Sequence, residues 1–91
     1  MSTFVIERNI PGASQMTHQQ LKEIATASNA VVDSLGVAYR WHHTYVAGDK
    51  LYCIHETDDA DTVREHARRG GFPAEVVAEI VATFGPETAD R

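Results

Sequence analysis

YRWHHTYVAGDKLYCIHE, residues 39–56, is the stretch of sequence that decides the fold. Aromatic and β-branched residues fill both of its ends, and 47–50 (Ala-Gly-Asp-Lys) is a turn sequence, so the stretch predicts a β-hairpin. Its strands are expected over 37–46 and 51–56. Three of the five histidines and the only cysteine of the chain lie inside it.

The segments on either side of the hairpin extend the pattern. A strand is expected over 3–8, and a helix over 17–35, where Thr17 and Gln20 form a capping-box pattern and apolar residues recur at helical spacing. A second helix is expected after Thr57-Asp58-Asp59 and ends at Gly70-Gly71. Residues 74–84 fit a helical stripe or a strand over 80–84, and periodicity does not separate the two.

The order strand, helix, strand, strand, helix and a final strand predicts an α+β, ferredoxin-like βαββαβ sandwich. Its four-stranded antiparallel sheet is expected to carry two helices on one face. We expect residues 1–84 to form a single domain and 85–91 to be a flexible tail.

Composition narrows the class of protein. The chain has 91 residues and a formal charge of −5, with no strongly basic patch, so nucleic acid is not an expected partner. One cysteine cannot form an internal disulfide, and the sequence shows neither a signal peptide nor a membrane span, which predicts a cytoplasmic protein without membrane partners. A core this small favours a homodimer.

The hairpin could hold a transition metal, because strands place alternate side chains on one face. Trp41, His43 and Tyr45 are expected to share a face. A two- or four-residue turn puts His42 opposite His55, whereas a three-residue loop puts His43 opposite Cys53.

In either register an imidazole and a thiol come within reach, and His66 of the second helix can approach the sheet edge. The candidate ligands are therefore His43, His55, His66 and Cys53, which suit nickel, zinc or another divalent transition metal. Glu7 or Glu56 could add a carboxylate. Binding needs neutral imidazoles, so affinity is expected to fall below about pH 6.

Several motifs resemble a bacterial family of small domains of unknown function that includes nickel-binding proteins. They are FVIERNIPG near the start, WHHTY and KLYCIHE in the hairpin, and VREHARRGGFPA after it. The resemblance implies a ferredoxin-like dimer and a fourth strand at the end of 74–84. It also implies that His43 rather than His42 is the motif histidine.

The leading hypothesis is a metal-binding protein, most readily for nickel, that acts in buffering, storage or sensing. A second hypothesis is a small dimeric enzyme or ligand-binding protein. In it Trp41, Tyr45 and Tyr52 line an aromatic pocket, and His43 or His66 is the general base. A third is a protein-binding module with no small ligand.

Overall fold

The computed structural model describes residues 1–90, and its element order confirms the predicted α+β, ferredoxin-like βαββαβ fold. The elements are β1 (Ser2–Asn9), η1 (Ala13–Gln15), α1 (His18–Ser34), β2 (Tyr39–Ala47), β3 (Lys50–Thr57), α2 (Ala60–Gly70), β4 (Val76–Glu79) and η2 (Pro86–Asp90). No helix in the described part of the chain is long and apolar enough to cross a membrane.

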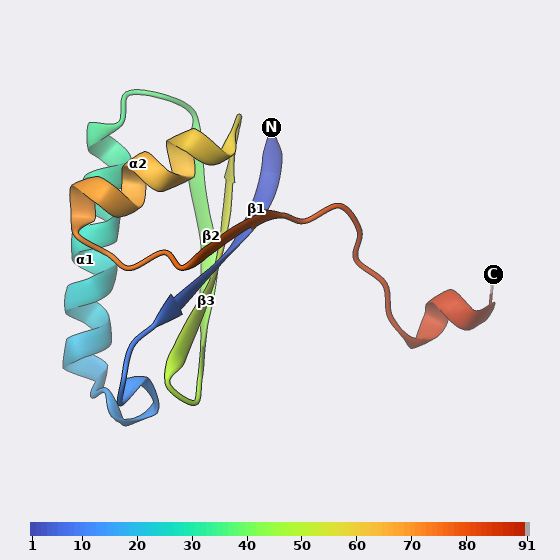
Figure 1. Cartoon of the computed structure of the whole chain (residues 1–91), viewed down its shortest axis with the longest axis horizontal. Coiled ribbons are helices and arrows are strands. Elements are labelled where there is room, and N and C mark those ends of the chain that lie inside the picture. The colour runs from blue at the N-terminus through green and yellow to red at the C-terminus, as the bar shows by residue number, and fades with distance from the viewer. Residues whose placement is uncertain (91) are drawn as a thin grey trace.

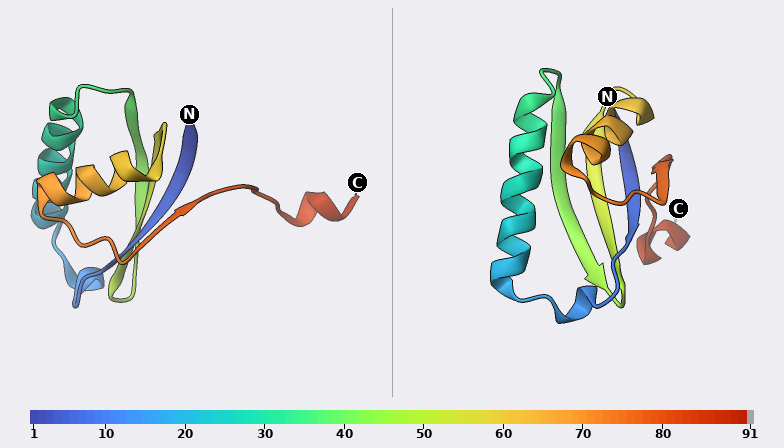
Figure 2. Two further views of the ribbon diagram at one scale, coloured as in Figure 1. Left: turned by 45° about the horizontal axis from the view of Figure 1, so that its top comes forward. Right: turned by 60° about the vertical axis from the view of Figure 1, so that its left-hand side comes forward.

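The strands form one antiparallel sheet in the order β2-β3-β1-β4, and both helices lie against the same side of it (Figures 1 and 2). Along β1 and β3 buried and half-buried residues alternate, as a sheet covered on one side requires. We call the covered side the helix face; it carries Phe4, Ile6, Arg8, Leu51, Cys53, His55 and Thr57. The opposite side is the free face; it carries Thr3, Val5, Glu7, Tyr52, Ile54 and Glu56.

The hairpin closes through a two-residue turn, and its β2 strand contains a bulge. Gly48 has φ of +61°, typical of the first position of a type II′ turn. Thr44 pairs with Cys53, but the pairing skips His42, so that Trp41 pairs with His55 and His43 with Ile54. The prediction that His42 faces His55 is therefore wrong, because the extra residue shifts the rest of the strand by one position.

The bulge also separates side chains that simple alternation places together. Trp41 and Thr44 both lie on the helix face, where Trp41 Nε1 donates to Thr44 Oγ1 at 2.9 Å. His43 and Tyr45 lie on the free face, beside Ile54. The prediction that Trp41 shares a face with His43 and Tyr45 is wrong for this reason.

The two helices cover the sheet unequally. The capping box at the start of α1 forms as predicted, with Thr17 Oγ1 accepting from the Gln20 N–H. However, the only residue that α1 buries is Ser28. The buried core takes Phe4, Ile6, Leu51 and Cys53 from the sheet, Ala13 from η1 and Val63 from α2, and no residue from α1.

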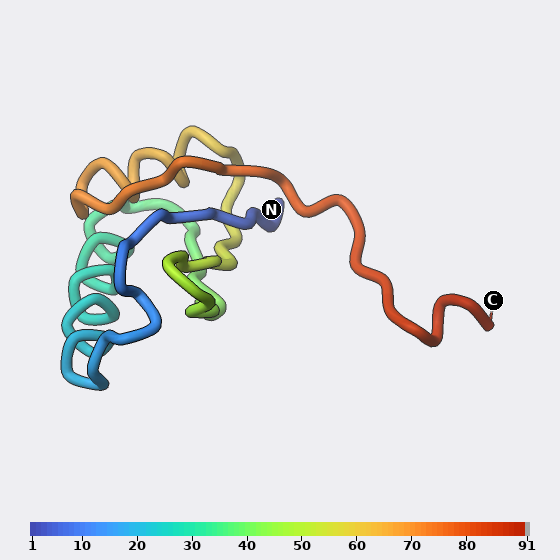
Figure 3. The backbone as a smooth tube through the Cα atoms, turned by 60° about the horizontal axis from the view of Figure 1, so that its bottom comes forward, coloured from blue at the N-terminus to red at the C-terminus, as the bar shows by residue number. Residues whose placement is uncertain are grey.

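The fourth strand begins earlier than the sequence suggests. β4 pairs with β1 so that Val77 lies opposite Ile6, and Ile80 N–H donates to the Thr3 carbonyl at 2.8 Å as the last sheet contact. The chain then leaves the body of the protein, and η2 lies at its far end (Figures 1 and 3). A helix over 74–84 and a strand over 80–84 are both wrong, because pairing with β1 selects 76–79. The flexibility of 85–91 stays a prediction, and residue 91 lies outside the described residues.

Deleting His42 should be far more damaging than replacing it. Without the extra residue β2 regains regular pairing, which turns Tyr39 and Trp41 to the free face and leaves His55 without its hydroxyl partner. We expect the deletion to lower the free energy of unfolding by at least about 3 kcal/mol in urea titrations. His42→Ala keeps the bulge and should change it by less than about 1 kcal/mol. Equal losses for both variants would contradict this account of the register.

Candidate metal site

Two imidazoles meet between the sheet and α2. His55 projects from the helix face of β3 and His66 from α2, and their exposed fractions are 1% and 0%. Their ring centroids are 5.0 Å apart and their planes are nearly perpendicular, at 79°. Of the four predicted ligands, His55 and His66 are the two whose rings contact each other.

Each ring uses one nitrogen for a hydrogen bond to a hydroxyl group. Tyr39 Oη is bonded to His55 Nδ1, and Ser28 Oγ lies 3.1 Å from His66 Nε2. His66 Nδ1 is buried with no partner, and no hydrogen bond joins His55 Nε2 to any other side chain or backbone group within residues 1–90. In metal-binding histidines, one ring nitrogen usually makes a hydrogen bond to an oxygen that fixes the ring, and the other nitrogen is free to bind the metal.

Aromatic rings enclose the histidine pair. Tyr39 stacks on His66 with centroids 5.3 Å apart and meets His55 edge to face at the same distance. Trp41 lies 6.4 Å from His55, and Phe72 lies 5.5 Å from His66. These rings hold both imidazoles in position and keep bulk water away from them.

Burial sets the charge state of the site. Desolvation, aided by the positive charges of His66 and Arg8, lowers the pKa of His55 to about 3. Desolvation and Arg8 lower the pKa of His66 to about 4. Burial also raises the pKa of Tyr39 above its ordinary value, although Arg8 opposes this. At neutral pH both imidazoles are therefore neutral, and Tyr39 keeps its proton. The free nitrogen of each ring carries the lone pair when the nitrogen bonded to the hydroxyl group carries the proton.

Cys53 shares the helix face with His55 but has a positive neighbour. Its buried sulfur accepts a hydrogen bond from Arg8 Nε at 3.4 Å. A guanidinium in this position repels a divalent cation at the same sulfur. Cys53 is therefore a poorer candidate ligand than His55 or His66.

His43 and the two candidate carboxylates lie on the free face, away from the histidine pair. His43 packs against Tyr45 with ring centroids 4.9 Å apart. Glu7 pairs with Lys50 at 3.3 Å, and Glu56 pairs with His42 at 2.9 Å. In the part of the chain that the structure describes, no three His, Cys, Asp or Glu side chains form a cluster able to hold a metal ion.

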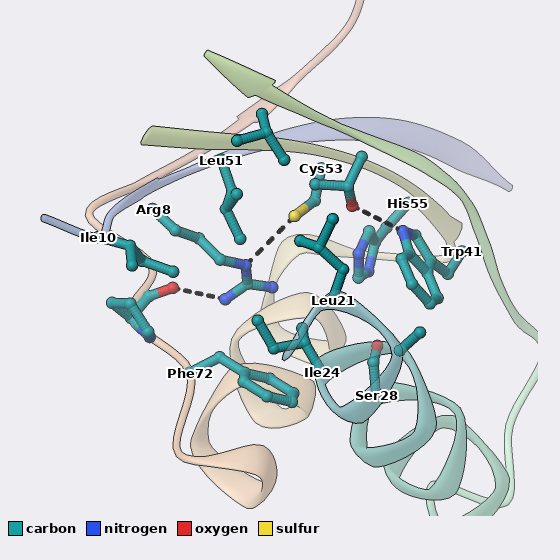
Figure 4. A pocket seen from close by; sticks show the side chains of 14 residues that line it. Arg8, Ile10, Leu21, Ile24, Ser28, Trp41, Leu51, Cys53, His55 and Phe72 are labelled. Atoms are coloured by element: carbon teal, nitrogen blue, oxygen red, sulfur yellow. Dashed lines mark hydrogen bonds between the residues drawn. The ribbon is translucent and has the colours of Figure 1, made fainter. Parts of the chain in front are cut away.

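A cavity of about 350 Å³ adjoins the site, between α1 and the sheet (Figure 4). His55, Cys53 and Trp41 line its sheet side. Tyr45 and His43 do not; they line a shallower hollow on the free face. Of the aromatic residues predicted to line one pocket, only Trp41 therefore reaches this cavity.

Sequence reasoning missed three polar residues of this region: Ser28, Tyr39 and Arg8. Each left a signal. Ser28 occupies a position of the apolar stripe of the first helix, and Arg8 continues the inward alternation of Phe4 and Ile6. A polar group at an inward position is a candidate for a buried contact. Tyr39 gave no comparable signal.

Comparison with solved structures supports the fold. The structure of SCO4226 from Streptomyces coelicolor A3(2) matches with a TM-score of 0.76 and 21% identity, covering 91% of this chain and all of that one. The heavy metal binding protein TM0320 from Thermotoga maritima matches with a TM-score of 0.48 and 22% identity, over 86% of this chain and 98% of that one. At these identities the likeness to the first structure shows the fold alone.

No curated protein matches the chain. The model of one protein family does match, described as nickel responsive protein SCO4226-like, and it covers residues 4–80. The match includes most of β1, both helices, the hairpin and β4, and so takes in all the residues of the candidate site. The chain belongs to the SCO4226-like family of nickel-responsive proteins.

Proposed function

We propose that this protein binds a divalent transition metal, most readily nickel, and acts in metal buffering, storage or sensing. The observation that carries the proposal is the buried pair His55 and His66. Each ring is anchored through one nitrogen and leaves the other free, and His66 Nδ1 has no partner within residues 1–90. Membership of a nickel-responsive family points to the same ligand.

The donors suit such an ion. Neutral imidazole binds nickel, zinc and copper well, and magnesium or calcium poorly. Two imidazoles on one ion, with bonds of about 2.0–2.1 Å, have ring centroids roughly 4.5–5 Å apart, close to the 5.0 Å separation of this pair. The bound ion would draw both rings to one centre. His55 and His66 supply two donors, and water, Cys53 or a second chain would supply the others.

A catalytic role for a histidine base fits less well. An efficient general base has a pKa near the working pH, whereas burial lowers the pKa of His66 to about 4. His43 lies on the free face, away from the cavity. A binding role needs only the neutral rings. A cytoplasmic location agrees with a single buried cysteine that has no internal disulfide partner.

We propose that the protein acts as a homodimer through the free face. Tyr45 is 59% exposed there, and Val81 and Phe84 in the departing C-terminal segment are 88% and 83% exposed. Large apolar side chains in this state favour burial against a partner. The free face also carries His43, so a dimer could bring the His43 side chains of two chains together.

Loss of either buried histidine should weaken metal binding. We expect calorimetric titration of the metal-free protein with nickel at pH 7.5 to give a saturable heat, and His55→Gln and His66→Gln to weaken binding at least tenfold, since each removes one donor. Cys53→Ser should retain binding. Zinc and cobalt titrations rank the metals.

His43→Ala is the matched control, because it removes an imidazole from the free face. It should bind nickel as the unaltered protein does. A loss of binding in His43→Ala alone would place the metal at the dimer seam and contradict the His55–His66 site. No heat with any of the three metals would remove the metal proposal.

The metal-free protein should become less stable as the pH falls from 7.5 to 5. Both buried imidazoles have pKa values of about 3 and 4 in the folded state, whereas an unfolded histidine has about 6.5, so the unfolded chain binds more protons in this window. We expect a loss of up to about 4 kcal/mol in urea titrations. His66→Gln should show roughly half of this dependence. A free energy of unfolding that does not change with pH would show that both imidazoles can be protonated in the folded protein, and would contradict this account.

Sedimentation velocity should give about twice the 10.0 kDa chain mass. Tyr45→Asp places a charge on the free face, and Phe84→Ala shortens the exposed C-terminal side chain, so both should shift the chain toward monomer. Gln19→Asp, on the exposed side of α1, should not. A monomeric unaltered protein, or dimers that neither free-face change weakens, would contradict the proposed interface.

A further inference from the structure

Arg8 is a buried cation without a counter-charge. Its side chain extends from β1 into the space under α1 and is only 4% exposed. Within residues 1–90 no carboxylate lies at ion-pair distance from it. Burying a charge is costly unless an opposite charge or several hydrogen bonds compensate it, so this arrangement points to a missing anionic partner.

The partners that Arg8 does have are neutral or weak. Nε donates to the sulfur of Cys53 at 3.4 Å, and one terminal nitrogen donates to the Pro73 carbonyl. The guanidinium carbon lies 5.3 Å from the centre of the Phe72 ring. These contacts hold the group in place but leave its other terminal nitrogen, Nη2, with no hydrogen bond to residues 1–90.

The guanidinium faces the cavity of about 350 Å³ (Figure 4). That volume is at the lower end of the about 300–1,000 Å³ usual for small-molecule sites. Its walls are mostly hydrocarbon; they include Ile10, Leu21, Ile24, Trp41, Val46 and Leu51. One fixed cation at the wall of an apolar cavity selects a ligand with one anionic group and an apolar body.

The helix above the cavity is incompletely buried. The apolar stripe of α1 faces the sheet, yet Ser28 is its only buried residue and Leu21 remains 36% exposed. The stripe therefore gains little from its contact with the sheet. An apolar molecule in the cavity would cover Leu21, Ile24 and Ala25 and supply the missing contact.

We propose that this cavity binds a small apolar carboxylic acid, whose carboxylate pairs with Arg8 and whose hydrocarbon body lies against α1. The flat guanidinium fork matches the two oxygens of a carboxylate. A phosphate group carries up to about two negative charges and would face a single cation here. The proposed ligand pairs with Arg8 and not with the nitrogen donors of His55 and His66, although His55 lines the cavity, and its binding does not depend on the metal proposal.

Trp41 makes the test direct, because it is the only tryptophan and it lines the cavity. Metal-free protein is titrated with octanoate and phenylpropionate, and separately with octanol and phenylpropanol, while tryptophan fluorescence is recorded. We expect a saturable change for the acids, with affinities at least about tenfold higher than those of the matched alcohols. Equal affinities within each pair, or no saturable change with any probe, would overturn the proposal.

Variants locate the charge. Arg8→Met removes the charge while keeping an unbranched side chain, and should weaken octanoate binding at least tenfold but change octanol binding less than twofold. Arg40→Met is the matched control, because Arg40 is an exposed arginine of β2, and it should change neither. Unaltered octanoate binding by folded Arg8→Met would overturn the proposal. If that variant does not fold, the acid and alcohol pairs on the unaltered protein decide the matter.

Discussion

The extra residue that His42 inserts into β2 is the constraint on which the rest of the site depends. Upstream of it, Tyr39 and Trp41 point toward the helices, and pairing of Trp41 with His55 brings the Tyr39 hydroxyl to His55 Nδ1. Downstream of it, His43 turns to the free face. Regular pairing would turn the Tyr39 and Trp41 rings away from the histidine pair. The bulge thus separates a buried imidazole pair on one face from an exposed imidazole on the other.

The two helices serve different purposes in this arrangement. α2 carries Val63 and His66 into the core and makes one side of the protein dense. α1 keeps its stripe over a cavity and contributes a single hydroxyl, from Ser28, to the histidine pair. Loss of packing under α1 leaves room for a ligand, and the compact half under α2 fixes the groups that would bind it. A fold of this size gains a site by leaving part of its core unfilled.

Sequence patterns predicted what depends on local periodicity. The alternation in β1 and β3, the capping box at Thr17 and the turn at Gly48 all lie within short windows, and they were enough for the fold class. The bulge could not be predicted, because Trp41, His43 and Tyr45 alternate regularly in the sequence. The start of β4 depends on pairing with β1, and contact between His55 and His66 depends on how α2 packs. Neither has a local signal in the sequence. The inward positions of Arg8 and Ser28, by contrast, could have been predicted from the periodicity of β1 and α1.

The permanent charge of Arg8 has a consequence for how long an ion would stay. It lowers the pKa values of both histidines, and no carboxylate within residues 1–90 lies at ion-pair distance from it. A divalent cation held by the neutral rings would be repelled by the guanidinium, which would weaken its binding. In the proposed function, weaker binding of this kind would favour reversible uptake and release of the ion over permanent retention.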